Sequence, residues 1–175
     1  MSTMYVMEAV NLFCGDEDPM AGKHLTISEL QLPELNEKFE DHNPGGGRVG
    51  IEVPVGIEKL VAPFKLNGVD PQLLTHFGLG TSVSKNYTAY GAVKDRRTGA
   101  TLESKAIMEG RLGKVGGDAF KRGELQGYDY SINSITHYEL FFDGKEKIFF
   151  DFFTNAWRVD GVDQNADVNR ILRIG

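Results

Sequence analysis

The residues from Tyr128 to Trp157 constrain the fold more than any other part of the chain, because aromatic and β-branched side chains dominate them. Asp143 and Gly144 stand in the middle of this stretch, and an Asp-Gly pair between apolar runs is a strong signal for a hairpin turn. The pattern predicts one long β-hairpin. We predict a three-residue loop, residues 142–144, because it sets Tyr138 opposite Ile148 and keeps the apolar residues of both arms on one face.

The second arm of this hairpin is apolar on both faces. One face carries Ile148 and Phe150, and the other carries Phe149, Phe153 and Trp157. A sheet that covers a single core needs only one apolar face. The second face therefore requires a cover, either a helix or loop of the same chain or another subunit, and the sequence leaves both possibilities open. On the first arm the apolar face is formed by Tyr128, Tyr130, Ile132, Tyr138 and Leu140.

A second hairpin is predicted over residues 34–58. Residues 49–57 alternate between apolar side chains and glycine, glutamate or proline, which is the period of a strand. A Gly-rich tip, residues 43–47, separates the two extended arms. Six acidic residues against two basic ones give this segment −4 of the chain's net charge of −6. The acidic residues are Glu34, Glu37, Glu40, Asp41, Glu52 and Glu58, and the basic ones are Lys38 and Arg48.

The remaining segments predict more strands and one helix. Asp70 can cap a short helix that begins at Pro71, with Leu73, Leu74 and Phe77 on its apolar stripe. Strands are expected at residues 4–14, 25–35, 87–93 and 100–112, a turn at 95–99, a mobile glycine-rich loop at 113–127 and a polar tail at 159–175. These elements predict a single mainly β domain over residues 1–175, a β-barrel or sandwich with one short α-helix and long hairpin and loop extensions.

Charge and motif content argue against several classes of function. A net charge of −6 lacks the basic footprint with which proteins grip nucleic-acid phosphates. The Gly-rich tip has no Lys-Ser/Thr pair and leads into a strand, so it is not a phosphate-binding loop. The four histidines are far apart, and no cofactor, metal site or catalytic group is predicted. Cys14 is the only cysteine, and no apolar run reaches the ~20 residues of a membrane span.

Several motifs, in the same order along the chain, resemble a known family. The strongest is Thr136–Glu146, which ends in Asp-Gly-Lys-Glu and is followed by Asn155 and Val159–Gln164. Weaker matches are Asn11–Phe13, Leu30–Leu35, Phe64–Gly68 and Asp95–Gly99. Together they resemble the major tail tube protein of contractile-tailed bacteriophages, which is related to the tube protein of type VI secretion systems. One departure is Asp160, where asparagine is commoner in the family.

The resemblance implies a structural function and no enzymatic activity. Such proteins form hexameric rings that stack into the inner tail tube, a conduit for DNA inside a contractile sheath. The implied partners are further copies of the chain, the tail sheath, tape measure, baseplate and tail terminator proteins, and DNA that crosses the lumen without specific binding. No cofactor and no membrane insertion are implied. The expected location is the virion tail, after assembly in the cytoplasm of the host bacterium.

We predict subunit and ring contacts at two places in the chain. The hairpin tip supplies Asn43, Gly45, Gly46, Gly47 and Arg48, and the doubly apolar arm supplies Phe149, Phe153 and Trp157. An acidic bore would let DNA slide, because like charges give no counterion-release gain. We therefore predict that Glu34, Glu37, Glu40 and Glu52 face the lumen; the alternative is an ordinary solvated strand face. Two rival functions remain: a phage-tail-like or type VI-like particle without a genome, and a ligand-binding barrel or hydrolase, which needs a polar pocket.

Overall fold

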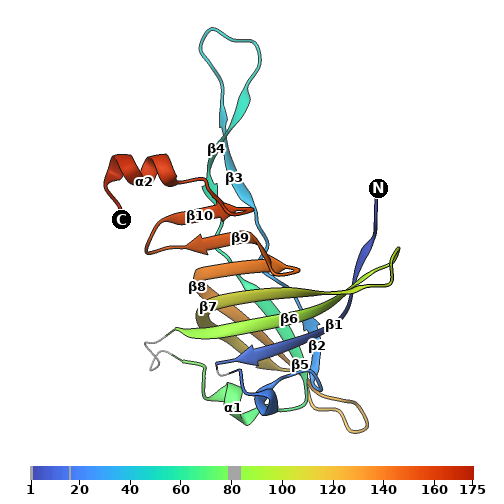
Figure 1. Cartoon of the computed structure of the whole chain (residues 1–175). Helices are drawn as coiled ribbons and strands as arrows, with labels where there is room; N and C mark the ends of the chain where they lie inside the picture. Colours follow the sequence, from blue (N-terminus) through green and yellow to red (C-terminus); the bar gives the residue numbers. More distant parts are fainter. Residues whose placement is uncertain (1, 16, 79–83) are drawn as a thin grey trace.

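A computed structural model describes residues 2–15, 17–78 and 84–175 (Figure 1). The strands in chain order are β1 (Tyr5–Cys14), β2 (Ile27–Leu30), β3 (Glu37–His42), β4 (Ile51–Ile57), β5 (Ala62–Asn67), β6 (Lys85–Asp95), β7 (Thr101–Gly117), β8 (Gly127–Phe142), β9 (Lys145–Asp151), β10 (Ala156–Val159) and β11 (Val162–Asp163). The helices are the 3-10 helix η1 (Pro19–Ala21) and the α-helices α1 (Pro71–Leu74) and α2 (Ala166–Leu172).

β8 organises the main sheet because it is long enough to have two different neighbours along one edge. Residues 127–132 pair with β5, whose other neighbour is β2, and residues 137–142 pair with β9. Along its other edge both halves of β8 pair with β7, which leads through β6 to β1. All of these pairings are antiparallel. The mainly β fold predicted from the sequence is confirmed.

The core lies between the β1–β6–β7 and β5–β2 branches of this sheet. Leu12 of β1, Leu66 of β5 and Met108 of β7 are each no more than 1% exposed. The predicted apolar face of the first hairpin arm is confirmed, since all five of its residues belong to this core or pack against it. Ile148 and Phe150 pack against the same core from β9. The period-two pattern thus identified correctly which side of this arm is buried.

The turn of the β8–β9 hairpin differs from the predicted three-residue loop. Phe142 pairs with Lys145, so the loop has two residues, Asp143 and Gly144, with φ of 50° and 72°. Positive φ at both positions fits the twist of a hairpin and explains the Asp-Gly pair. A bulge between Leu140 and Phe141 of the pairing then leaves Lys147 unpaired on β9, so that Leu140 lies opposite Ile148. The bulge restores the predicted pairing of even-numbered residues with each other, but the predicted pair of Tyr138 with Ile148 is wrong, because Tyr138 lies opposite Phe150.

The second arm of this hairpin ends earlier than predicted. β9 stops at Asp151, whose Oδ1 accepts hydrogen bonds from the backbone N and the Oγ1 of Thr154, at 2.9 and 3.0 Å. The chain turns over residues 152–155, and β10 pairs back on β9 with Trp157 opposite Phe150. The prediction of one continuous strand to Trp157 is therefore wrong, because the Asp151 carboxylate stabilises a turn there.

The predicted loop at residues 113–127 is shorter in the structure, where it covers only 118–126. β7 continues through Gly113, Gly116 and Gly117, and β8 begins at Gly127. Gly113 is required by a close approach, because a Cβ there would lie 2.5 Å from Oδ1 of Asn133 on β8. A glycine that permits such an approach is compatible with a strand.

The helices differ from the prediction in extent and number. Asp70 caps α1 as predicted, its Oδ1 accepting from the backbone N of Gln72 and Leu73 at 3.1 Å each. Leu73 is buried, but Leu74 and Phe77 are exposed. α2 lies in the tail, where no helix was predicted. No helix among the described residues is long and apolar enough to span a membrane.

Candidate assembly surfaces

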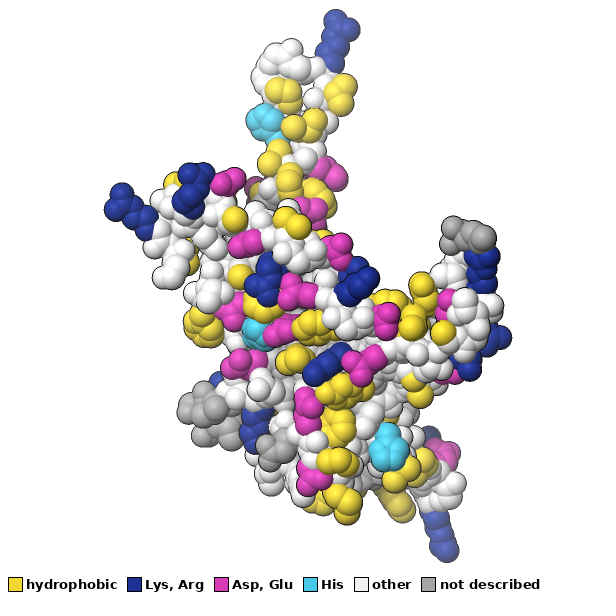
Figure 2. Space-filling model, viewed as in Figure 1, with side chains coloured by type: hydrophobic (Ala, Val, Ile, Leu, Met, Phe, Trp, Pro, Cys, Tyr) yellow, Lys and Arg dark blue, Asp and Glu magenta, His cyan; other side chains and the backbone are white. Residues whose placement is uncertain are grey.

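β3 and β4 form a two-stranded sheet of their own, separate from the main sheet, and project from one end of the molecule (Figure 1). Every residue of both strands is exposed. Apolar side chains are nevertheless frequent, and Phe39, Ile51, Val53 and Val55 are 39–60% exposed. Figure 2 shows hydrophobic side chains along this projection. An isolated two-stranded ribbon is marginally stable in water, so an apolar ribbon of this kind is a surface suited to contact with another molecule.

The pairing of β3 with β4 separates the predicted lumen-facing acids. Asp41 lies opposite Glu52, and Glu37 shares their face; Glu40 lies opposite Val53 on the other face. Glu34 precedes β3, where its carboxylate accepts hydrogen bonds from Nε2 of Gln31 at 2.5 Å and Nδ2 of Asn36 at 3.3 Å. A two-stranded ribbon can line a channel with only one of its two faces. The four acids are therefore not brought together, and their position in a lumen stays a prediction.

The hairpin tip, residues 43–50, extends beyond the last strand pair, His42 with Ile51. Asn43, Gly45, Gly46, Gly47 and Arg48 are all exposed. A Cβ added to Gly45 or Gly46 would meet nothing within 4 Å. The tip therefore contributes nothing to the core of its own subunit, and its role in ring contacts stays a prediction.

The structure separates the three aromatic residues that were predicted to share one face. Trp157 lies on the core-facing side of the sheet, opposite Phe150 in the pairing, with 6.0 Å between the ring centres. Phe149 lies on the opposite face. Phe153 stands in the turn between β9 and β10 and is 76% exposed. Their assignment to one face is wrong, because the turn at 152–155 folds Trp157 back. Of the three, Phe153 is exposed, and the other two are partly buried.

Phe149 is covered largely by charged side chains of its own chain. The guanidinium carbon of Arg158 lies 3.5 Å from the centre of the Phe149 ring, and the same guanidinium binds the Glu146 carboxylate with two N–O distances of 2.9 Å. The His137 ring packs edge-on against Phe149 with 5.1 Å between centres. The cover thus comes from the same chain, but from side chains of β8, β9 and β10 rather than from the helix or loop that the sequence analysis considered.

His137 joins two carboxylates on this face. Its Nε2 lies 2.6 Å from Oε1 of Glu139, and its Nδ1 lies 3.0 Å from Oδ2 of Asp151. Burial lowers the pKa of the imidazole, but the two carboxylates outweigh burial and the net pKa of His137 is raised. The pKa of Asp151 is lowered, because hydrogen bonds from Thr154 and His137 outweigh the effect of burial. This arrangement links β8 to β9 by ion pairs that depend on pH.

A groove of about 700 Å³ separates the base of the β3–β4 hairpin from β9 and β10. Its lining is mostly apolar and includes Ile57, Ile135, Phe150 and Trp157.

Next to this groove, α2 exposes apolar side chains that were not predicted to form a surface. Val168, Ile171 and Leu172 are 46–72% exposed. Their spacing of three and four residues was a helical signal that could have revealed α2.

The described residues include neither a cluster of metal ligands nor a reactive thiol. No three His, Cys, Asp or Glu side chains among them form a group that could hold a metal ion. Burial raises the pKa of the Cys14 thiol to about 12, so the thiol stays protonated at neutral pH.

Most of this chain is similar in sequence to known proteins. A model of the family described as phage tail tube protein FII matches residues 6–172. The tail tube protein of Escherichia phage P2 is 26% identical over 138 residues, which cover 77% of this chain and 80% of the phage protein. The family match confirms the resemblance seen in the sequence.

Two solved structures are similar in fold, each at 9% sequence identity and a TM-score of 0.50. One is the sheath/tube terminator of an extracellular contractile injection system in its extended state, with 73% of this chain and 91% of that chain covered. The other is a chain from the six-fold symmetrised baseplate of the anti-feeding prophage, with 81% of this chain and 94% of that chain covered.

Proposed function

Because the chain belongs to the phage tail tube protein FII family, a structural and non-enzymatic family, we propose that it forms hexameric rings that stack into the inner tube of a contractile tail. The observation in the structure that carries this proposal is the β3–β4 hairpin. All of its strand residues are exposed although many are apolar. A neighbouring subunit that covered the hairpin would remove this apolar surface from water, which favours association.

The proposed partners follow from the same assignment. Further copies of the chain form the rings, a sheath protein surrounds the tube, and terminator and baseplate proteins close its ends. The fold similarity to chains from a sheath/tube terminator and a baseplate supports these contacts. A tape measure protein inside the tube is proposed from the family resemblance alone. The proposed location is the virion tail, assembled in the host bacterial cytoplasm.

The proposed interface residues differ in how open they are. The tip residues Asn43 to Arg48 and the turn residue Phe153 are exposed and free to meet a neighbour. Phe149 and Trp157 are partly covered by side chains of their own chain, so we expect them to pack beneath the interface residues rather than to form the centre of the interface.

We propose that the tube conducts DNA. The similarity to the phage P2 protein favours this function. A bore lined by carboxylates would not retain the polyanion. Since only one face of the β3–β4 ribbon can line the bore, the face of Glu40 and the face of Glu37 and Glu52 are alternatives. The similarity in fold to injection-system chains favours a second candidate, a tail-like particle that carries no genome.

Negative-stain microscopy and sedimentation of the purified protein test the proposal. Rings or tubes that grow in length with protein concentration are the expected result. A protein that stays monomeric at high concentration would contradict assembly as its function. Nuclease-treated particles from producing cells separate the two candidates, because only a genome-carrying tail is attached to protected DNA.

A further inference from the structure

One face of the β3–β4 hairpin combines an apolar pair with an acidic pair. Phe39 lies opposite Pro54, and the next residues on that face are Asp41 and Glu52, which also lie opposite each other. Phe39 is 47% exposed. We call the surface formed by these four residues the acidic hairpin face.

The acidic pair is unfavourable in the isolated subunit. Like charges directly opposite each other on neighbouring strands repel. Within the described residues, no Lys, Arg or His nitrogen lies within 4.0 Å of either carboxylate. A cationic surface that met this face would remove the repulsion and cover Phe39. The face therefore favours a partner that is both basic and apolar.

One part of the loop of residues 118–126 has this chemistry, while Asp118 and Glu124 balance the charge of the loop as a whole. Phe120 and Leu125 are 77% and 75% exposed. Lys121 and Arg122 lie between them and are also exposed, without an ion-pair partner among the described parts of the chain. A hollow of about 260 Å³, lined in part by Lys121 and Leu125, opens in this loop. We call residues 120–125 the basic loop.

The base of the basic loop is held in place by the main sheet. Lys65 Nζ of β5 lies 3.1 Å from Oδ2 of Asp118, and the backbone N of Asp118 donates to the carbonyl of Gly127 at 2.8 Å. Nε2 of Gln126 donates to the carbonyl of Asp118 at 2.6 Å. Both ends of the loop are thus attached to the sheet, which lowers the backbone ordering cost of binding.

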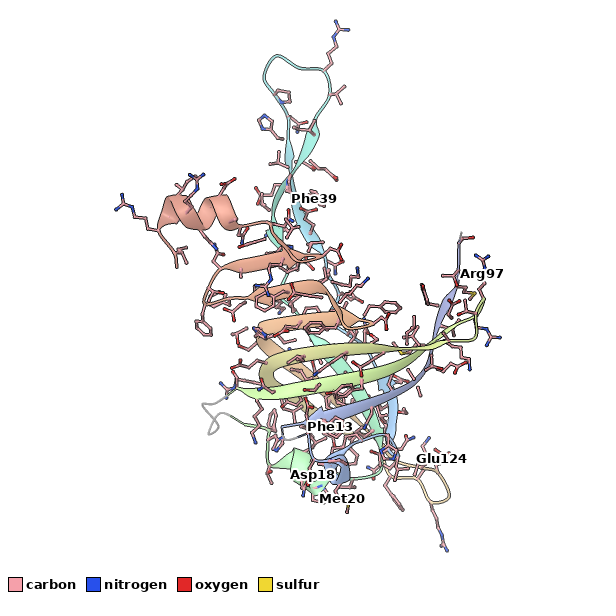
Figure 3. All side chains as sticks on the ribbon, viewed as in Figure 1. Phe13, Asp18, Met20, Phe39, Arg97 and Glu124 are labelled. Atoms are coloured by element: carbon pink, nitrogen blue, oxygen red, sulfur yellow. The ribbon has the colours of Figure 1, made fainter. Side chains whose placement is uncertain are left out.

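The two surfaces lie at opposite ends of the subunit. Figure 3 labels Phe39 on the hairpin at one end and Glu124 on the loop at the other. The two surfaces therefore belong to a contact between different copies. Contacts between two dissimilar surfaces of identical subunits are heterologous and repeat from copy to copy. The hairpin end carries the acidic pair and the loop end carries Lys121 and Arg122, and both ends expose apolar side chains. Two such ends are suited to a contact that repeats from copy to copy.

We propose that the acidic hairpin face of one copy docks on the basic loop of a copy in the next ring, with Asp41 and Glu52 against Lys121 and Arg122, and Phe39 against Phe120 and Leu125. This inference rests on the proposed stacking of rings. It assigns the face of Glu52 to ring–ring contact and leaves the face of Glu40 for the bore.

Charge reversal and its rescue test the proposal. One variant carries Asp41→Lys and Glu52→Lys, a second carries Lys121→Glu and Arg122→Glu, and a third carries all four changes. Each two-site variant should raise the critical concentration for tube formation at least about 100-fold, since facing like charges strongly disfavours an interface. The four-site variant restores opposite charges and should recover tubes. A matched control, Lys145→Glu with Arg173→Glu, changes two exposed charges elsewhere and should assemble as the wild type does.

Measurement of rings as well as tubes separates this inference from the proposed function. Two-site variants that still form single rings but no tubes, together with rescue in the four-site variant, would establish the contact. Tubes from either two-site variant at the wild-type concentration, or failure of the four-site variant to recover, would overturn it. The same loss of tubes in the control would overturn it too, because net charge would then be the cause. Absence of any assembly by the wild type would instead contradict the proposed function.

Discussion

Replacing Phe153 by aspartate is the change expected to weaken assembly most while leaving the subunit folded. Phe153 is 76% exposed in the turn between β9 and β10. A fully covered aromatic side chain buries ~150–250 Å², so a neighbour could cover roughly 115–190 Å² of this one. At ~25 cal/mol per Å², that burial stabilises the assembly by about 3–5 kcal/mol per subunit as an upper bound. Each ~1.4 kcal/mol is tenfold in an equilibrium constant, so the critical concentration should rise by a factor of about 100 to 4,000.

The assay is sedimentation of tubes over a range of protein concentrations, with urea unfolding of the soluble subunit measured in parallel. The free energy of unfolding should change by no more than about 0.5 kcal/mol, because the side chain is exposed. Phe153→Leu, which keeps an apolar side chain, is the matched control and should retain most of the assembly. An unchanged critical concentration for Phe153→Asp would refute the reasoning, because it would mean that no neighbour covers this turn.

Three further predictions concern the hairpin tip, the His137 network and the bore. Replacing residues 43–50 by a two-residue Asn-Gly turn should leave the melting temperature nearly unchanged and abolish ring stacking, since the tip has no contacts with the core; tubes of normal length would make the tip a mere connector. The pKa of His137 in the folded protein is raised above its usual 6.5. The ion pairs of His137 therefore stabilise the fold fully below pH 6.5, and this stabilisation is lost as the pH rises through the folded-state pKa. The difference in Tm between wild type and His137→Gln should thus be larger at about pH 6 than at about pH 9, and a difference independent of pH would argue against the network. In tubes that still assemble, Glu40→Lys should create salt-sensitive affinity for DNA, whereas Asp167→Lys on α2 should not; unchanged DNA binding by Glu40→Lys would place that face outside the bore.

The sequence predicted which residues are buried better than it predicted how strands pair. Alternation along β8 identified Tyr130, Ile132 and Tyr138 as core residues, because burial on one face imposes a period of two. The pairing depends on bulges, which leave little trace in the sequence. One bulge corrects the β8–β9 register, and another, between Lys38 and Phe39 of the β3 pairing, shifts β3 against β4.

The candidate surfaces were predicted less well than the core. The position of Trp157 depends on a turn that Asp151 and Thr154 form through side-chain hydrogen bonds, and local apolar patterning does not reveal such a turn. The same patterning could not show that Glu40 and Glu52 lie on opposite faces, because β4 has an extra residue at the bulge. Exposed apolar residues on a projecting hairpin have no core to fix their phase. Surfaces that are buried by other copies are thus the hardest to assign from one chain.

Cryo-electron microscopy of the assembled protein tests the central claim most directly. We predict stacked rings with six-fold symmetry in cross-section, in which the acidic hairpin face of each subunit is buried against the neighbouring ring. Monomers at high concentration, or an assembly in which the β3–β4 hairpin stays exposed to solvent, would contradict the account.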